Sequence, residues 1–218
     1  MTHSTTRRAL LTAAPLCLGG ASLLLPGLAM AAPASLSAVD KALVAKATAY
    51  LQSLQSAKGR FVQTDARGSQ TQGTLYMQRP GKARFEYEAP SSLLVVSDGK
   101  VVSVADKRLK TVNRYWLSQT PLKLFLADEV RLDRGVHVSQ VTKLADGFQI
   151  TAQDKAGKTK GQIVLTFGDS PMQLLGWTVT DARNAPTRVR LTNLARASSL
   201  DPALFKTPFP TTGRAPAS

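Results

Sequence analysis

The spacing of apolar residues changes once along this chain, and that change limits the fold more than any other feature. Over residues 36–54 apolar side chains recur every three or four positions, the spacing of an amphipathic helix. Ser37 with Asp40 predicts the start of this helix, and Gly59 predicts its end. From Arg60 onward apolar and polar residues alternate, which is typical of strands with one buried face. We therefore expect a mainly β protein, of the α+β class, with one long N-terminal helix.

The alternating part divides into about eleven short strands separated by turn signals. In residues 97–100, Asp98 and Gly99 favour the positive φ of a type I′ hairpin turn. Because one face of each strand is apolar, we expect an antiparallel sheet that curls around one apolar interior. The residues expected to face this interior are Leu75, Met77, Ala83, Phe85, Tyr87, Phe148, Ile150, Ile163, Leu165, Phe167, Leu175, Trp177, Val179, Val189 and Leu191.

Residues 120–127 interrupt the strands. Thr120 followed by Pro121 is typical of a helix start. The segment is too apolar for an exposed helix, so we expect it to lie as a lid across the open side of the sheet. The lid residues are Leu122, Leu124, Phe125 and Leu126.

The first residues predict an export signal. Arg7 and Arg8 precede an apolar stretch that is broken by glycine and proline and ends in Ala29-Met30-Ala31, an A-x-A cleavage site. We expect a signal peptide over residues 1–31, and prefer it to a transmembrane anchor because of those breaks. Both the general and the twin-arginine export routes stay open. We expect a periplasmic location, one domain over residues 32–210, and a flexible tail over 211–218.

The sequence lacks most of the motifs that mark catalytic or metal-binding sites. The chain has 1 Cys and 2 His, so we expect no metal site, no cofactor and no catalytic residue. Residues 152–159 match a relaxed P-loop pattern, but a strand follows them where a P-loop needs a helix. His137 lies in a strand pattern with nothing that marks it as a base. Glu86 and Glu88 share one strand face and are expected to point to solvent.

The formal net charge of +14 raises three partner classes, which are nucleic acid, anionic lipid and acidic protein. An exported protein does not meet chromosomal DNA or ribosomes, so we expect no nucleic acid. The basic residues are scattered along the sequence. A solvated surface and a docking surface for an acidic partner or lipid head groups both remain open.

The continuous apolar face, together with the lid, predicts a ligand cavity closed by Leu122, Phe125 and Leu126. The alternative is a fully packed core. The expected lining residues are Leu75, Met77, Phe85, Tyr87, Leu94, Val96, Leu165, Phe167 and Trp177.

Arg79 falls in phase with Leu75 and Met77, on the apolar side of its strand. A charge aimed at a dry interior is costly unless it is hydrogen-bonded. One interpretation is that Arg79 reaches solvent at the strand end. The other is a latch at the cavity rim, where the guanidinium would donate to carbonyls of the lid near residues 122–128.

The order of several motifs resembles the LolA family of lipoprotein carriers. The matching segments are residues 59–64, 73–75, 79–87, 94–100, 120–122 and 201–210, which together cover nearly the whole chain after the signal. The chain departs from the family pattern at Ala83, where the family often has a large apolar residue, at Phe85, where it often has Trp, and at Val102, where it has an aromatic pair.

The resemblance implies an unclosed β-barrel with a helical lid over an apolar cavity. It also implies a monomeric periplasmic shuttle that takes acylated lipoproteins from an inner-membrane ABC transporter to an outer-membrane receptor. The alternative function is a lipid-sensing or lipoprotein-sensing regulatory protein of the same fold. A hydrolase is disfavoured because the sequence shows no nucleophile with a base.

Overall fold

The computed structural model describes residues 36–132, 136–155, 161–181 and 183–207. The signal peptide, the tail and residues 156–159 of the P-loop-like segment lie outside these residues. The elements in chain order are α1 (Ala38–Ser53), β1 (Ser56–Thr64), β2 (Gln70–Gln78), β3 (Lys82–Tyr87), β4 (Leu93–Asp98), β5 (Val101–Asp106), β6 (Thr111–Trp116), a 3-10 turn η1 (Leu117–Gln119), α2 (Lys123–Leu126), β7 (Val136–Leu144), β8 (Gly147–Asp154), β9 (Gln162–Asp169), β10 (Met172–Thr180), β11 (Pro186–Arg196) and a 3-10 turn η2 (Pro202–Phe205).

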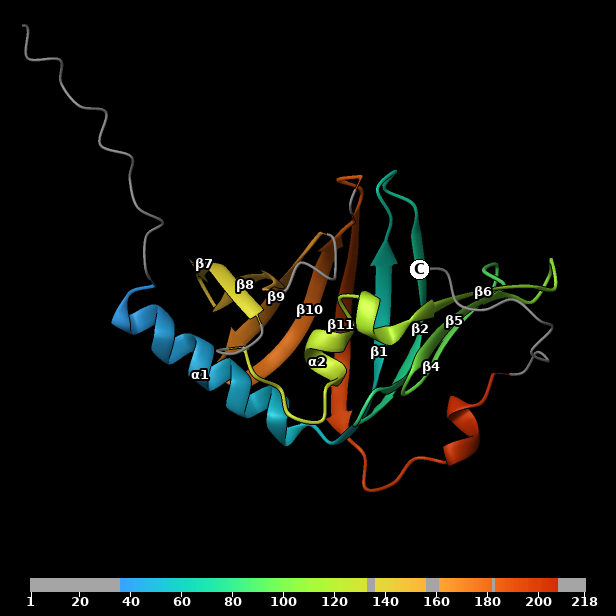
Figure 1. Cartoon of the computed structure of the whole chain (residues 1–218), viewed down its shortest axis with the longest axis horizontal. Helices are drawn as coiled ribbons and strands as arrows, with labels where there is room; N and C mark the ends of the chain where they lie inside the picture. Colours follow the sequence, from blue (N-terminus) through green and yellow to red (C-terminus); the bar gives the residue numbers. More distant parts are fainter. Residues whose placement is uncertain (1–35, 133–135, 156–160, 182, 208–218) are drawn as a thin grey trace, which may run out of the picture. The chain divides into compact units, whose positions relative to one another are not determined.

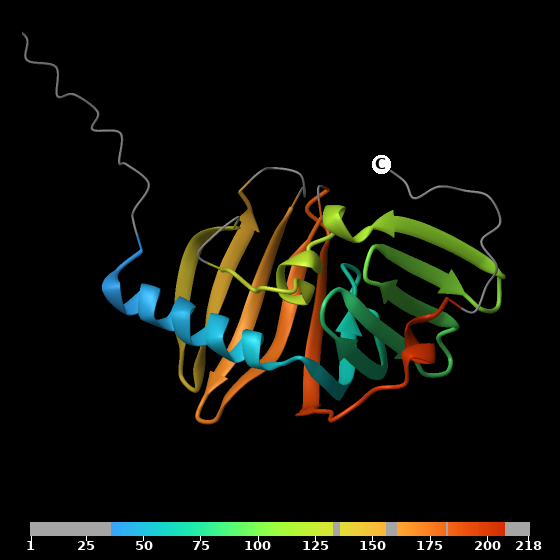
Figure 2. The same ribbon diagram turned by 60° about the horizontal axis from the view of Figure 1, so that its bottom comes forward.

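The strands of the described residues form one antiparallel sheet in the order β6-β5-β4-β3-β2-β1-β11-β10-β9-β8-β7 (Figure 1). Strands β6 and β7 end the sheet and do not pair with each other, so it stays open. Helices α1 and α2 lie on the same side of the sheet (Figure 2). We call this covered side the lid face and the opposite side the outer face. The mainly β fold, its strand number and its unclosed sheet are as expected.

The start of α1 is as predicted, but its end is not. Ser37 and Asp40 form a reciprocal capping box. The helix ends at Ser53, because the N–H of Leu54 turns back to the carbonyl of Leu51 at 3.1 Å. Gly59 lies inside β1, where a Cβ would come within 3.0 Å of the backbone of Leu194 on β11. This glycine therefore serves close packing of two strands rather than a helix stop.

The core lies between the lid face and α1. Val44, Ala47 and Leu51 of α1 are buried in it together with the inward residues of the strands. None of the helices in the described part of the chain has both the length and the apolar content needed to cross a bilayer.

The inward side of β10 differs from the expected alternation. The pairing of β10 with β9 shifts between Leu174 and Gly176. As a result Leu174, not Leu175, is buried on the same side as Trp177. A Cβ on Gly176 would lie 2.2 Å from the carbonyl oxygen of Val189, so the bulge requires glycine there. Strict alternation could not predict this one-residue slip.

Leu94 and Val96 were expected in the cavity, and that expectation is wrong. Directly paired residues of antiparallel strands share a face, and Phe85 pairs with Val95 rather than with either of them. Leu94 and Val96 are buried on the outer face in a separate cluster with Ala105. Both faces of β4 are covered, so its residues form an unbroken apolar run. Such a run does not show which residues point to which face of the sheet.

The C-terminal segment packs against this part of the sheet. Turn η2 contacts β3 and β4, and Phe205 is only 3% exposed. The carbonyl of Leu204 accepts a hydrogen bond from Arg84 at 3.2 Å. The segment explains why β4 is apolar on both sides.

We expect Phe205→Ala to lower the free energy of unfolding by about 3 kcal/mol, because it removes a buried aromatic side chain from the outer face. Leu204→Ala, at a half-buried neighbour, should cost clearly less. Urea denaturation of both variants measures the difference. Equal effects would show that η2 does not anchor the segment through Phe205.

Candidate functional site

The expected cavity residues on the lid face are packed rather than hollow. Leu75, Met77, Phe85, Tyr87, Leu165, Phe167 and Trp177 all belong to the main core and are at most 8% exposed. Leu94 and Val96 lie on the other face. The centre of the lid face is therefore a packed core and not a cavity.

Aromatic rings fill that centre. Phe61 of β1 contacts Phe85 at 5.5 Å and Tyr87 at 5.0 Å between ring centroids, both edge to face. Trp177 lies 6.1 Å from Phe85. Phe125 of the lid packs on Trp177 at 4.9 Å. Lid segment 120–127 thus covers the aromatic centre of the sheet, as the sequence predicts, with Phe125 and Leu126 buried and Leu122 and Leu124 half-buried.

The hydroxyl of Tyr87 donates a hydrogen bond to the side-chain amide oxygen of Gln63 at 2.7 Å. Burial raises the pKa of Tyr87 to about 12, and the bond to Gln63 opposes this only in part. The phenol is therefore neutral at physiological pH. It adds a satisfied polar group to an otherwise apolar centre.

A hollow of about 830 Å³ lies to one side of this centre, between α1, residues 129–132 and the start of β7. None of the expected cavity residues lines it. Its walls are largely aliphatic, and polar side chains lie among them. The lining residues are Leu36, Lys41, Val44, Ala45, Thr48, Ala49, Gln52, Glu129, Val130, Arg131, Leu132, Val136, His137, Val138 and Lys155. We call it the α1-side hollow.

Two alanines on one face of α1 are a feature of the sequence that could have pointed to this hollow. Ala45 and Ala49 are one helical turn apart on the face of α1 that lines it. Small side chains on one helix face leave room between that face and the sheet. Both alanines are exposed, whereas Val44 beside them is buried.

A second hollow of about 170 Å³ lies beside the lid. It shares Glu129, Arg131 and Val136 with the first hollow. Its other walls come from the lid and from the ends of β8 and β9. We call it the lid-side hollow.

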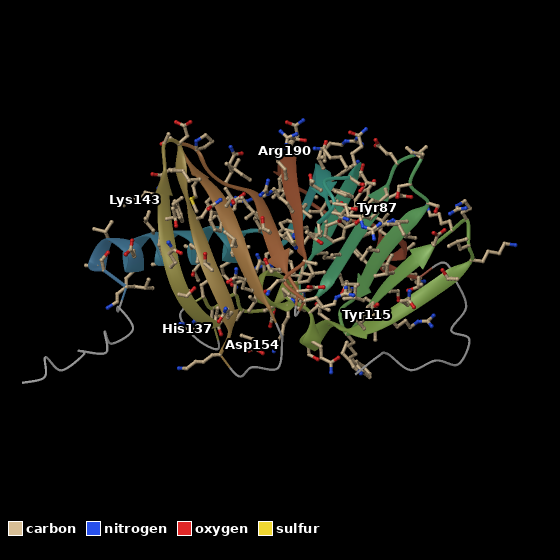
Figure 3. All side chains as sticks on the ribbon, turned by 90° about the horizontal axis from the view of Figure 1, so that it is seen from above. Tyr87, Tyr115, His137, Lys143, Asp154 and Arg190 are labelled. Carbon is tan, nitrogen blue, oxygen red and sulfur yellow. The ribbon has the colours of Figure 1, made fainter. Side chains whose placement is uncertain are left out.

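Charged groups lie around the α1-side hollow and include Lys41, Arg131 and Lys155. Arg131 pairs with Glu129 at 2.7 Å. His137 also borders the hollow, near the end of β7 that lies beside Asp154 (Figure 3). Basic groups around an apolar hollow suit a ligand with apolar chains and a polar or anionic end.

Arg79 is buried at the end of β2, with 6% of its surface exposed. None of its three guanidinium nitrogens has a hydrogen-bond partner among the described residues. Burial lowers its pKa to about 10, so the group remains charged at neutral pH. Both sequence-based interpretations need correction in this conformation, because the side chain neither reaches solvent nor bonds to the lid.

The lid is held instead by the backbone of the turn after Arg79. The N–H of Gly81 donates to the carbonyl of Leu126 at 2.6 Å. Gly81 has φ +73, and a Cβ there would lie 2.7 Å from the Cα of Gly99. Leu126 is one of the lid residues whose carbonyls were candidates to bind Arg79, and its carbonyl accepts from the backbone of Gly81.

The strand carboxylates are paired with cations. Arg60 donates to Glu88, which lowers the pKa of Glu88. Arg84 donates to Glu86 at 3.2 Å, which lowers the pKa of Glu86. Each carboxylate is an ion-pair partner rather than a general acid. Within the described ranges no three His, Cys, Asp or Glu side chains gather in a way that could hold a metal ion.

Known proteins resemble this chain in sequence. The family model of the outer membrane lipoprotein carrier protein LolA matches residues 52–208. An outer-membrane lipoprotein carrier protein of Pseudomonas syringae pv. syringae is 34% identical over 127 residues, which cover 54% of this chain and 56% of that relative. The chain thus spans little more than half the length of that relative. A carrier protein of the same name from Chromobacterium violaceum is 29% identical and covers 81% of this chain and 85% of its own length.

Among solved structures, a LolA superfamily protein from Nitrosomonas europaea, NE2245, covers 76% of this chain and 98% of its own, with 7% identity and a TM-score of 0.44. The family assignment rests on the sequence match, which runs from the last residues of α1 past η2. The chain belongs to the LolA family of outer membrane lipoprotein carrier proteins.

Proposed function

We propose that this protein is a periplasmic carrier that holds the acyl chains of lipoproteins and delivers them to a receptor in the outer membrane. The observation that carries the proposal is the α1-side hollow, whose aliphatic walls enclose about 830 Å³. Hollows of roughly 300–1,000 Å³ are typical of small-ligand sites. Acyl chains are the apolar ligand that the family's relatives suggest by name.

The energetics suit a carrier. Moving an acyl methylene out of water is worth about 0.8 kcal/mol, whether the destination is a bilayer or an apolar hollow. Transfer from membrane to protein is therefore nearly neutral per methylene. Small differences between empty and loaded forms then decide whether cargo is taken up or released.

The unpaired guanidinium of Arg79 supplies one such difference. Arg79 lines neither hollow but lies two residues before Gly81, and we assign it the role of destabilising the closed lid, because a buried donor without partners costs free energy. The tie between Gly81 and Leu126 holds the lid in place. Release of that tie is the movement that would open the aromatic centre beneath Phe125.

The proposed partners follow from the same assignment. Acylated lipoproteins come from a lipoprotein-releasing ABC transporter of the inner membrane, and an outer-membrane receptor accepts them. The carrier acts as a monomer, after removal of a signal peptide over residues 1–31. No catalytic step is part of the proposal.

The test is native mass spectrometry of the protein purified from the periplasm, followed by transfer of its cargo to receptor-containing outer-membrane vesicles. We expect a lipoprotein bound one to one and passed to the vesicles. Free phospholipid as the main bound species would favour a lipid-sensing role, and a protein without any lipid would contradict the carrier proposal.

A further inference from the structure

The two hollows are separated by one short stretch of chain, residues 128–132, which we call the bridging segment. It follows α2, and none of its residues lies in a helix or strand. Glu129 and Arg131 of this segment line both hollows, and so does Val136, the first residue of β7. The segment therefore forms the partition between the α1-side hollow and the lid-side hollow.

The side chains of the bridging segment alternate between the interior and the surface. Val130 and Leu132 are each 1% exposed and belong to the main core. The side chains of Glu129 and Arg131 are 67% and 30% exposed and pair with each other. The segment thus turns two branched aliphatic side chains toward the core and the α1-side hollow, while its paired charges lie along the partition between the hollows.

One side chain of α1 binds the backbone of the bridging segment. The amide nitrogen of Gln52 donates to the carbonyl of Asp128 at 3.3 Å, and its amide oxygen accepts from the N–H of Val130 at 2.8 Å. The side-chain amide therefore pairs with the segment as a neighbouring strand would. Gln52 also lines the α1-side hollow.

We propose that the two hollows are the two ends of a single acyl-chain groove, whose middle is closed by the bridging segment when no cargo is bound, and that Gln52 holds this segment in place. This inference rests on the proposed carrier function and goes beyond it, because it names an internal competitor for the cargo. Gln52 is a positioning residue that acts through the bridging segment.

The free energies of cargo binding and of displacing the bridging segment oppose each other. Acyl methylenes replace valine and leucine side chains in the same apolar space, so cargo entry and segment displacement largely compensate. Displacing the segment does not separate its charges, because Glu129 and Arg131 pair with each other within the segment. The apparent affinity for acyl chains is then the intrinsic affinity reduced by the fraction of molecules whose segment is displaced.

The decisive variant is Gln52→Leu, which removes both hydrogen bonds and keeps a side chain of similar size. We expect fluorophore-labelled palmitate to bind roughly three- to tenfold more tightly, the factor that corresponds to one or two lost neutral hydrogen bonds. Hydrogen exchange at the amide of Val130 should accelerate by a similar factor. Gln52 also lines the α1-side hollow, so Thr48→Val is the control for added apolar surface: Thr48 lines the same hollow and bonds only within α1, and its substitution should not reproduce the gain in affinity or the faster exchange at Val130.

Gln55→Leu is the matched control. Gln55 is exposed, and its amide bonds to the backbone of Gln52 rather than to the bridging segment. It should leave both palmitate binding and Val130 exchange unchanged. Gln52→Glu keeps an acceptor for the N–H of Val130 but loses the donor to Asp128, so we expect it to lie between wild type and Gln52→Leu.

The outcomes separate this inference from the carrier proposal. If wild type binds labelled palmitate and Gln52→Leu binds it no more tightly, the competitor idea is wrong and the carrier proposal stands. If neither protein binds, the carrier proposal fails and the inference fails with it. Tighter binding by Gln52→Leu, with faster exchange at Val130, supports the shared groove.

Discussion

Ala49→Trp should weaken acyl-chain binding at least tenfold. Ala49 lines the α1-side hollow from α1, and an indole there fills space that the proposed cargo needs. Excluding two methylenes costs about 1.6 kcal/mol, which corresponds to more than a tenfold loss of affinity. Titration with labelled palmitate measures the effect, and a melting curve shows whether the fold is intact.

Ala42→Trp provides the control for this substitution. Ala42 is exposed on the same helix and does not line the hollow, so helix propensity and added apolar surface change in the same way. It should bind palmitate as wild type does. Equal losses in both variants, or no loss in Ala49→Trp, would place the acyl site outside the α1-side hollow.

Arg79→Leu should raise the melting temperature by about 2 to 10 °C. The substitution removes a buried guanidinium that has no partner among the described residues. Relief of an unsatisfied buried donor is worth ~1–3 kcal/mol, and each kcal/mol shifts the melting temperature of a domain of this size by roughly 2–4 °C. Calorimetry of the two proteins makes the measurement.

The same substitution at Arg84 should have the opposite sign. Arg84 donates to Glu86 and to the carbonyl of Leu204, so Arg84→Leu loses existing bonds. Arg79→Lys keeps a buried charge and should not be stabilised. A lower melting temperature for Arg79→Leu, similar to that of Arg84→Leu, would mean that Arg79 has a partner in the folded protein and that our assignment is wrong.

The local pattern of the sequence was sufficient for the elements of the fold. A capped amphipathic helix, a change to alternation and an apolar lid segment each follow from nearest neighbours along the chain, and α1, eleven strands and α2 are where these patterns place them. The motif order was also sufficient for the family. Ser37 and Asp40 illustrate the reason, since three residues of spacing determine a capping box without reference to the rest of the protein.

Only the tertiary structure determined which face of the sheet each strand residue occupies and how the side chains pack. Leu94 and Val96 read as interior residues, but the C-terminal segment covers the outer face of β4, so both faces of that strand are apolar. The bulge at Gly176 exchanges Leu175 for Leu174 in the core. Neither a distant covering segment nor a one-residue slip leaves a mark in the local alternation.

The location of the hollow depended on tertiary structure for the same reason. An apolar face shows that something must cover it, but not whether the cover fills the space. Phe61, Phe125 and Trp177 fill the centre of the lid face, whereas Ala45 and Ala49 leave room beside α1. Whether apolar surface becomes core or cavity depends on the volumes of side chains that are brought together from distant parts of the chain, and only the folded arrangement determines which of them meet.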